Sequence, residues 1–429
     1  MQTPEYIPYQ RKRARGWLFL AVPLAGILLA LLVYQIPRVQ RAVDWRMDIA
    51  ITYLTHILRP SAMLPPPVVK SHLAGDFQTA TPLPPTATTQ PSPTPLISPT
   101  PTLTPTPIPS QVALTPPAYD EAKDKQDWNN CGPATLALYL RYYGWKGDQF
   151  DISRIIKPER DDRNVNVEEL VYYVRSYAGW LNAEFRVAGD IDILRKLLAE
   201  GVPVMIEKTF TTDRKYWPED DRWSGHYLLI TGFDDQQRLF TAQDSEIGPN
   251  QRFDYDMLDG YWQSFNRVYI LVYPPEKEAA IQSILGEQWD RAKNREHALK
   301  VAQAETEKDQ NNAFAWFNLG SNLVYFERYI EAAQAYDQAR LIGLPQRMFR
   351  YQFGPFMAYF HSGRTEDLMA LTKYALEITR VSEEAMLWRG WGFYRLGDKS
   401  AALSMFRAAL KVRPDYEDAL YAIDFVNAN

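Results

Sequence analysis

Four side chains in the middle of the sequence have types and spacings that suit nucleophilic chemistry, and the first is a lone cysteine. Cys131 is the only cysteine of the 429 residues, and Gly132-Pro133 and an apolar run with helical spacing follow it. Proline suits the first turn of a helix, because its missing N–H would have no partner there. A thiol at a helix N-terminus lies at the positive end of the helix dipole, which favours the thiolate. Cys131 is therefore a candidate nucleophile; its alternative role is a small buried residue that begins a core helix.

A thiolate nucleophile needs a base within reach, a group that orients the base, and donors for the oxyanion. His226 is the only histidine between residues 118 and 275, and the other four lie outside this segment. It begins a β-like run and follows Gly225, which would leave room for a substrate. The sequence therefore predicts that Cys131 and His226 form a pair. The alternative is that His226 has a structural role.

The orienting group is expected at the end of the next β-like run. Asp244 follows the run 238–242 there, so a turn back from the His226 strand would bring it close to the imidazole. Asp234 and Asp235 are alternatives. Both lie in the expected hairpin turn, where Asp is favoured for its own local hydrogen bonds. We therefore predict Asp244.

A side-chain amide upstream of the cysteine could help to bind an oxyanion. Gln126 precedes Cys131 by five residues, so its amide could donate together with the backbone N–H of Cys131. Asn129 and Asn130 are alternatives, although their positions are typical of turn and N-cap residues. The predicted catalytic set is completed by Gln126.

The elements that must position these residues change type at about residue 201. Before it, apolar residues recur with helical spacing, and after it come short β-like runs separated by turn signals. Helices followed by strands favour an α+β fold with an antiparallel sheet. We expect helices over residues 131–143, 167–178 and 191–200, and strands over 202–206, 227–231, 238–242 and 267–273.

The motifs Gln126-x4-Cys131-Gly-Pro-Ala, Gly225-His226-Tyr and Gln243-Asp244-Ser245, in this order, resemble the bacteriocin-processing cysteine peptidases. This is the papain-like family of double-glycine leader peptidases and their stand-alone relatives. The resemblance covers about residues 118–275. It implies a papain-like fold with Cys131 as nucleophile, His226 as general base and acid, Asp244 as orienting group and Gln126 in the oxyanion hole.

Two features depart from that family's pattern. Typical members precede an ATP-binding transporter, whereas this sequence contains no P-loop, and Ser245 follows Asp244 where proline is common. Peptidase chemistry is therefore implied more firmly than specificity for a leader peptide.

Residues 279–429 contain a repeat. Leu285-Gly286 aligns with Leu319-Gly320 at a spacing of 34 residues, and Ala298 aligns with Ala332. A 34-residue period with small residues at such places is typical of tetratricopeptide repeats, because Gly and Ala let the two helices of a unit approach closely. We expect four units and a final helix from about Asp418, forming an all-α solenoid. The alternative is a generic helical array. Further matching positions are Tyr336 in the second unit, Phe356, Leu368 and Ala375 in the third, and Gly390, Ala402, Phe406, Ala409 and Pro414 in the fourth.

The N-terminal region predicts a membrane anchor. Residues 17–36 form an uncharged, mostly apolar run of about the length that spans a bilayer as a helix. Four basic residues precede it, which favours a cytoplasmic tail over residues 1–16. The run ends without a small-residue cleavage site, so an uncleaved transmembrane helix is favoured over a signal peptide. In either case the rest of the chain is expected to be exported.

Two segments separate the anchor from the expected catalytic domain. Residues 37–81 form a membrane-proximal segment. Residues 82–117 are rich in Pro, Thr and Ser and cannot bury a core. Such a composition is expected to be extended and semi-rigid, as a polyproline II spacer.

Composition excludes some classes of function. The net charge of −5 and the lack of a large basic block give no sign of nucleic-acid binding. A single cysteine excludes an intrachain disulfide and a cysteine-based zinc cluster, and no cofactor is expected.

Together these features predict a membrane-anchored, extracytoplasmic cysteine peptidase. Its expected substrate is a peptide or protein, and its repeats would dock a protein partner. One alternative is a catalytically silent papain-like scaffold that works through its repeats, although such a domain has no chemical reason to keep all four residues. A second is acyl transfer or amidase chemistry on a non-protein substrate.

Overall fold

The computed structural model describes residues 16–36, scattered positions between 39 and 58, and residues 63–68, 107–160, 162 and 165–429. The predicted cytoplasmic tail and most of the predicted Pro/Thr-rich linker lie outside the described residues. The chain divides into two units, residues 1–60 with 215–220, and residues 61–214 with 221–429.

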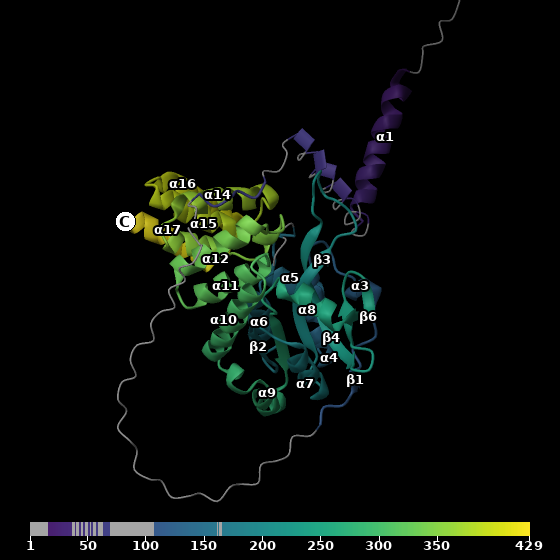
Figure 1. The fold of residues 1–429 in the computed structure, drawn as a ribbon. Helices are drawn as coiled ribbons and strands as arrows, with labels where there is room; N and C mark the ends of the chain where they lie inside the picture. Colours follow the sequence, from purple (N-terminus) through teal and green to yellow (C-terminus); the bar gives the residue numbers. More distant parts are fainter. Residues whose placement is uncertain are drawn as a thin grey trace, which may run out of the picture. The chain divides into compact units, whose positions relative to one another are not determined.

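A seven-stranded antiparallel sheet forms the centre of residues 107–275 (Figure 1). Its strands follow the order β2-β7-β3-β4-β5-β6, and β1 pairs with the far end of β4. The four predicted strands are all present, and the α+β class with an antiparallel sheet is confirmed. The bounds are β1 Gln111–Ala113, β2 Asn182–Arg186, β3 Val204–Thr211, β4 Trp223–Asp234, β5 Leu239–Asp244, β6 Gly248–Asp254 and β7 Tyr269–Tyr273.

Helices pack on both faces of this sheet because its central strands are apolar on both sides. In β4, Tyr227 and Leu229 join one core while Leu228 and Ile230 join the other, as the two-residue period of a strand requires. One face is covered by α4 Cys131–Tyr142, α5 Gln149–Ile156 and α6 Val167–Tyr177. The other is covered by α7 Ile191–Ala199, α8 Tyr255–Gln263 and α9 Glu278–Leu285; a short helix α3, Glu121–Asp124, precedes α4.

The folded domain begins before the predicted end of the linker at residue 117. Val112 pairs with Phe233 of β4, and Ile108 and Leu114 pack against the core. These apolar residues are scattered among Pro, Thr and Ser, so their composition resembles that of the linker. The linker boundary predicted from composition is therefore wrong by about ten residues.

Several elements were absent from the sequence prediction for local reasons. Strands β2 and β6 are mostly polar, so they give no apolar alternation. Helix α5 is short but starts with a capping box. The Asp148 side chain accepts the backbone N–H of Asp151, and the Asp151 side chain accepts the backbone N–H of Asp148. Because β2 lies between two helices, the order is not simply helices first and strands later.

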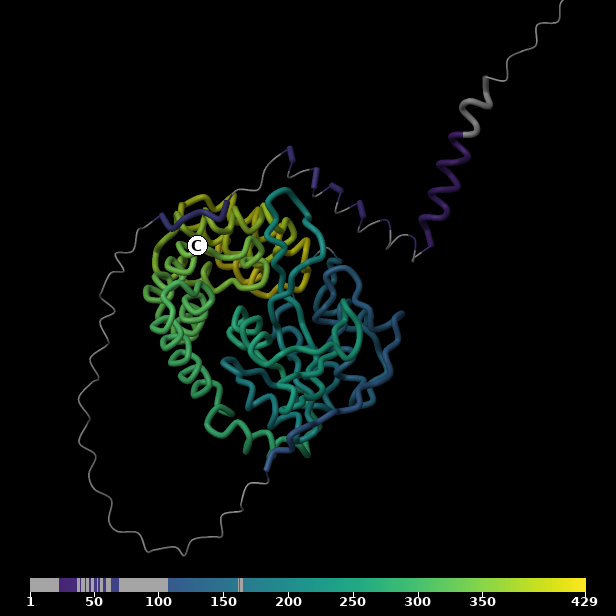
Figure 2. The backbone as a smooth tube through the Cα atoms, turned by 45° about the vertical axis from the view of Figure 1, so that its right-hand side comes forward, coloured from purple at the N-terminus to yellow at the C-terminus, as the bar shows by residue number. Residues whose placement is uncertain are grey.

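The C-terminal region consists of antiparallel helix pairs (Figure 2). Tetratricopeptide-like packing is visible where the sequence predicts it. A Cβ atom on Gly320 would lie 2.7 Å from the Tyr336 ring, and one on Gly390 would lie 2.4 Å from the Phe406 ring. The helices are α10 Arg291–Lys308, α11 Ala313–Tyr325, α12 Tyr329–Ile342, α13 Gly354–His361, α14 Thr365–Ile378, α15 Glu383–Arg395, α16 Lys399–Val412 and α17 Glu417–Ala428, with 3-10 turns at Pro275–Lys277, Gly286–Trp289 and Met348–Arg350.

The first predicted repeat unit has a different form. Gly286 ends α9 with a positive φ of 54°, whereas its aligned partner Gly320 lies inside α11 and packs against Tyr336. At the first position the glycine therefore ends a helix, and at the second it allows two helices to pack closely. The regular pairs begin with α11.

Polar and charged side chains join the repeats to residues 107–275. The Asn266 side chain donates to Asn322 at 2.9 Å, and Arg267 pairs with Glu305 at 2.7 Å. Arg413 forms an ion pair with Glu169 of α6. These contacts hold the loop before β7 and the start of α6 against the repeats.

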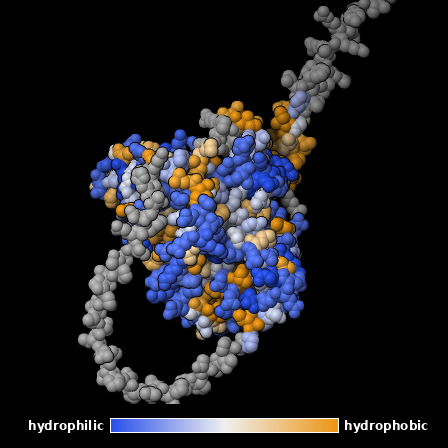
Figure 3. Space-filling view, in the orientation of Figure 1, coloured by the Kyte–Doolittle hydropathy of each residue, from blue (hydrophilic) through white to orange (hydrophobic). Residues whose placement is uncertain are grey.

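Helix α1, Gly16–Tyr34, belongs to the other unit. Its described side chains are apolar and exposed, among them Leu24, Ile27 and Leu32, and Figure 3 shows hydrophobic residues gathered along it. Within the described residues, no helix has the length and apolar character that a membrane crossing requires. The anchor predicted over residues 17–36 stays a prediction.

Candidate active site

Cys131 begins helix α4, and a buried glutamine organises the loop before it. Gln149 of α5 is 1% exposed. Its Oε1 accepts the backbone N–H of Asp127 and the side-chain amide of Asn130, both at 2.8 Å. Its Nε2 donates to two backbone carbonyls just upstream. The loop is held from both sides, so that the helix starts at Cys131, whose thiol is free and half-buried.

His226 and Asp244 come together from neighbouring strands. In the pairing of β4 with β5, Asp244 lies opposite Leu228, two residues along from His226. His226 Nε2 lies 2.8 Å from Asp244 Oδ1, and the two side chains are 3% and 0% exposed. The same carboxylate oxygen accepts the backbone N–H groups of Glu246 at 2.7 Å and Ile247 at 3.0 Å. Three hydrogen bonds therefore fix the carboxylate that orients the imidazole.

The protonation of His226 follows from these partners. Burial alone would lower the pKa of His226. The hydrogen bond and charge of Asp244, together with the hydrogen bond and charge of Cys131, outweigh burial and raise the pKa to about 9. Burial would raise the pKa of Asp244, but its bonds to His226 and to the backbone lower it. Since Asp244 occupies Nε2, Nδ1 is the ring nitrogen left for the thiol. A charged imidazolium beside a thiol favours the thiolate.

Two residues of β3 complete the surroundings of the imidazole. The Phe210 ring lies 4.9 Å from the His226 ring, centroid to centroid. Lys208 pairs with His226 across the two strands and is 4% exposed. Burial lowers the pKa of Lys208 to about 8, while the charge of Asp244 acts in the opposite direction. Asp244 therefore faces two groups that can carry positive charge.

Gln126 is held by the residue that departs from the family pattern. The Ser245 hydroxyl donates to Gln126 Oε1 at 2.9 Å, and the Gln126 backbone N–H donates to the Ser245 carbonyl at 2.9 Å. Because Oε1 is occupied as an acceptor, Nε2 is the end of the amide left to donate. Its place in an oxyanion hole stays a prediction.

The alternative aspartates have other partners. Asp234 Oδ1 accepts the backbone N–H groups of Gln236 and Gln237, both at 3.0 Å, as expected of a turn residue. Asp235 accepts the Tyr255 hydroxyl and pairs with Arg195. The carboxylate that the structure brings to His226 is Asp244.

Asn129 and Asn130, the alternatives to Gln126, have different surroundings. The Asn130 side chain donates to Gln149, so it supports the loop rather than an oxyanion. Asn129 has a positive φ of 52° and lines a pocket beside Cys131.

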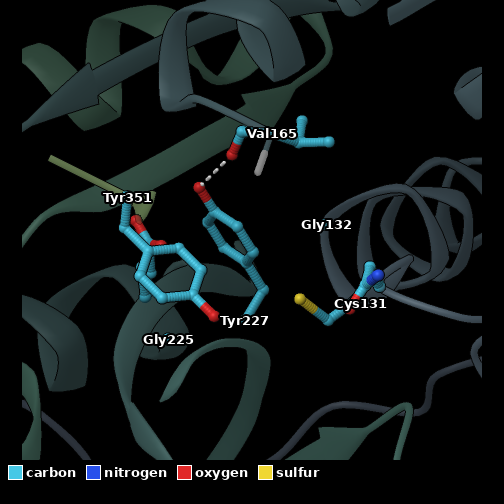
Figure 4. A pocket seen from close by; sticks show the side chains of 8 residues that line it. Cys131, Gly132, Val165, Gly225, Tyr227 and Tyr351 are labelled. Carbon is cyan, nitrogen blue, oxygen red and sulfur yellow. Dashed lines mark hydrogen bonds between the residues drawn. The ribbon is translucent and has the colours of Figure 1, made fainter. Parts of the chain in front are cut away.

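A pocket next to Cys131 has walls from both the sheet and the repeats (Figure 4). Gly225 packs against Tyr351 in its wall, and a Cβ atom on Gly225 would lie 3.2 Å from that ring and 2.6 Å from Phe265. The Tyr351 hydroxyl lies 2.7 Å from Ser224 Oγ. The repeats therefore shape the site directly. The lining residues are Asn129, Cys131, Gly132, Val165, Glu207, Gly225, Tyr227 and Tyr351.

Glu207 is a buried carboxyl in this pocket that the sequence prediction missed. It is 6% exposed, and burial, followed by the charge of Cys131, raises its pKa well above the usual range. Tyr227 donates its hydroxyl proton to the Val165 carbonyl at 2.9 Å, as the dashed line in Figure 4 marks. The hydrogen bond with Tyr227 and the charge of His226 act in the opposite direction and lower the pKa of Glu207, but burial outweighs them. The net shift favours the neutral form of Glu207.

Of the site residues that the sequence prediction missed, some have a local sequence signal and others have none. Glu207-Lys208 is a charged pair that follows the apolar run 202–206 and continues the same strand, β3. Buried charges within a strand are rare, so this pair was a usable signal. Tyr351 comes from the repeats, and nothing local connects it with Cys131.

Comparison with known proteins supports the same reading of the segment. Residues 110–270 match the family model described as Peptidase_C39 like family. The resemblance predicted for this segment from its motifs is confirmed. No curated protein matches the chain.

Solved structures resemble separate parts of the chain. A putative C39-like peptidase from Bacillus anthracis is 16% identical, with 38% of this chain and 96% of that chain covered and a TM-score of 0.27. Xylellain, a cysteine protease from Xylella fastidiosa, is 15% identical, with 39% and 87% covered and a TM-score of 0.29. YrrB, a tetratricopeptide-repeat protein with an unusual peptide-binding site, is 23% identical, with 35% and 73% covered and a TM-score of 0.28. Likenesses of this size say nothing about activity.

Proposed function

We propose that residues 107–275 form a cysteine peptidase domain that hydrolyses peptide bonds. The observation that carries this proposal is the bond between His226 Nε2 and Asp244 Oδ1, because it leaves the other ring nitrogen for Cys131, the only thiol of the chain. The match of residues 110–270 to the C39-like peptidase family supports the same chemistry.

The proposed reaction uses Cys131 as nucleophile and His226 as general acid and base. The Cys131 thiolate attacks the peptide carbonyl, and the imidazolium of His226 protonates the leaving amine. The neutral imidazole then takes a proton from water, which attacks the thioester and releases the acid. Asp244 keeps the ring oriented throughout and stabilises its charged form.

The oxyanion that forms during the attack needs donors at its position. The backbone N–H of Cys131, at the start of α4, is one proposed donor. The Nε2 amide of Gln126 is the other, with Ser245 holding the opposite end of that amide. Gln126→Ala should therefore lower turnover without preventing the alkylation of Cys131.

A mixture of peptides tests the peptidase proposal without knowledge of the substrate. The full chain is incubated with a proteome-derived peptide mixture, and new termini are identified by mass spectrometry. Cleavage should disappear in Cys131→Ala and fall at least about a hundredfold in His226→Ala. His297→Ala, which changes a histidine outside the domain, should leave cleavage unchanged.

The two rival functions predict other results in the same experiment. A catalytically silent scaffold would give no new termini with any of the proteins. Acyl transfer or amidase chemistry would give products that depend on Cys131 but contain no cleaved peptide bond.

We also propose that residues 17–36 anchor the chain and that its C-terminal domains face away from the cytoplasm. The support is the uncharged run of the sequence and the apolar side chains along α1. The protein should stay in the membrane fraction after extraction at alkaline pH, and external protease should reach the catalytic domain in intact spheroplasts. Release of the intact protein at alkaline pH would contradict the anchor.

A further inference from the structure

A short proline-rich segment of the chain lies against the repeats. Met63–Val68, with the sequence Met-Leu-Pro-Pro-Pro-Val, is drawn in purple beside the green and yellow helices in Figure 2. The Pro65 carbonyl accepts Arg340 Nη2 of α12 at 2.6 Å. The Val68 backbone N–H donates to Asp367 Oδ1 of α14 at 3.0 Å. The segment is therefore bound at both ends of a four-residue stretch.

Both of these hydrogen bonds use backbone atoms of the segment. Leu64, Pro65 and Pro66 each precede a proline, which restricts them to extended or polyproline II conformations. In polyproline II one turn takes three residues, so groups at positions i and i+3 lie on the same face. Between Pro65 and Val68 the prolines carry no N–H, and Val68 supplies the first donor. The contact therefore recognises an extended backbone with a carbonyl followed three residues later by an N–H.

The side chains that bind the segment belong to a buried network within the repeats. With the segment in place, the Arg340 side chain is 0% exposed and that of Asp367 is 1% exposed, and the two pair at 3.1 Å. Arg340 also donates to the Tyr359 hydroxyl at 2.8 Å. Arg364 bonds to Asp367 at 2.7 Å and to Asp337. Two arginines and two aspartates balance each other, so the site does not need the segment for its charge.

We propose that Arg340 and Asp367 form a binding site for extended, proline-containing peptides, and that Met63–Val68 occupies it as an exchangeable intramolecular ligand. This site is separate from the peptidase chemistry and does not depend on it. A free peptide with the same backbone pattern would compete with the segment for the same two side chains.

Covalent connection favours the internal segment over a free peptide. A tethered ligand acts at an effective concentration that is set by the length and stiffness of its connection. Closing the chain between Val68 and the sheet costs conformational entropy that rises slowly with length. A free peptide should therefore bind the intact protein weakly, and it should bind well once the internal segment loses its contact.

The backbone pattern gives a matched pair of variants. Val68→Pro removes the N–H that donates to Asp367. Val68→Ala keeps that N–H and only shortens a side chain that is 51% exposed. In the full chain, a fluorescent peptide of residues 61–70 should bind Val68→Pro at least about tenfold more tightly than wild type, since a hydrogen bond to a charged group is lost. Val68→Ala should bind it as weakly as wild type does.

Two further measurements fix the site. Adding Arg340→Ala to Val68→Pro should abolish binding of the peptide, while unchanged circular dichroism shows that the repeats stay folded; Arg340→Lys serves if they do not. A peptide with proline at the Val68 position should bind about tenfold less tightly. Equal binding of the peptide by Val68→Pro and Val68→Ala, in folded proteins, would overturn the proposal.

Discussion

Buried carboxyl side chains in two regions of this molecule have pKa values that are shifted in opposite directions. In the candidate active site, Asp244 is 2% exposed and its pKa is lowered. Between α6 and α15, burial raises the pKa of Glu169 to about 7, against the opposing charge of Arg413. Glu383 and Glu384 are also buried, and burial together with neighbouring carboxylates raises the pKa of both. Burial is common to the two groups, so it cannot be what separates them.

The partners of each carboxyl explain the difference. Asp244 accepts three hydrogen bonds on one oxygen and faces His226 and Lys208, both of which can be cationic. Glu169 pairs with Arg413, but Glu383 and Glu384 have other carboxylates as their charged neighbours. Asp244 is arranged to stay ionised beside a base, whereas the glutamates are arranged to hold protons. The first arrangement suits a carboxylate that orients an imidazole.

Replacing His226 with alanine should have the largest effect, because it removes the proposed general acid and base and the partner of Asp244. A positioned general acid and base contributes about 10²–10⁴-fold to a rate. Turnover of the peptide mixture should fall by about that factor. The glutamates near α15 should be unaffected, so the loss of stability between about pH 5 and 6 should stay as in wild type. The additional loss that His226 contributes as pH rises from 6.5 to about 9 should disappear.

Asp244→Asn should have a smaller effect that appears in the pH profile. Asparagine Oδ1 can still accept from His226 Nε2, but the negative charge that raises the pKa of His226 is lost. Wild-type activity should fall as pH rises through about 9, where the imidazolium loses its proton. In Asp244→Asn this fall should begin at lower pH, with turnover reduced about tenfold near neutrality. An unchanged profile would mean that Asp244 does not set the protonation of His226.

The glutamates should make the protein less stable as pH rises. The pKa of Glu169 is higher in the folded chain than its ordinary value of 4.5, so the folded state binds more protons. The corresponding stability is fully present below pH 4.5 and is lost as pH rises through about 7. The free energy of unfolding should fall by about 1–3 kcal/mol across this range, as urea unfolding at several pH values would measure.

Variants of two glutamates test whether the buried glutamates cause this loss of stability. Glu383→Gln replaces a buried carboxyl with a neutral side chain, so the decline with pH should become shallower. Glu417→Gln changes an exposed glutamate at the start of α17 and should leave it unchanged. Equal slopes in wild type and Glu383→Gln would show that the buried glutamates do not titrate as described.

Glu207 sharpens the comparison, because it lies in the active site yet resembles the neutral glutamates. Glutamine can donate to the Tyr227 hydroxyl as a protonated carboxyl does. Glu207→Gln should therefore change the alkylation rate of Cys131 by less than about threefold. A large increase in that rate would indicate that Glu207 is ionised and opposes the thiolate.

The sequence allowed the central residues to be predicted because the choices were few. One cysteine and one histidine lie in the segment 118–275, and Asp244 follows the next strand. Strand ends and turns are local, so the spacing along the chain was enough to predict that Asp244 lies beside His226. The pairing of Cys131 with His226 stays a prediction. The α+β fold followed from the same change in periodicity.

Other features depend on contacts between distant parts of the chain. Gln149 holds the loop before Cys131, but its role requires the packing of α5 beside α4. Tyr351 reaches the pocket only through the docking of the repeats. The apolar residues of β1 were hidden within a Pro/Thr-rich composition, although Val112 pairs with β4. Such features need the tertiary structure.

The pH dependence of Cys131 alkylation tests most directly whether His226 activates the thiol. The full chain and His226→Ala are treated with iodoacetamide at mildly acidic and neutral pH, and the rate of modification of Cys131 is measured by mass spectrometry. We predict that wild-type Cys131 reacts fast even at mildly acidic pH, and that His226→Ala slows it at least about tenfold there. A rate like that of an ordinary thiol in wild type, unaffected by His226→Ala, would contradict the account.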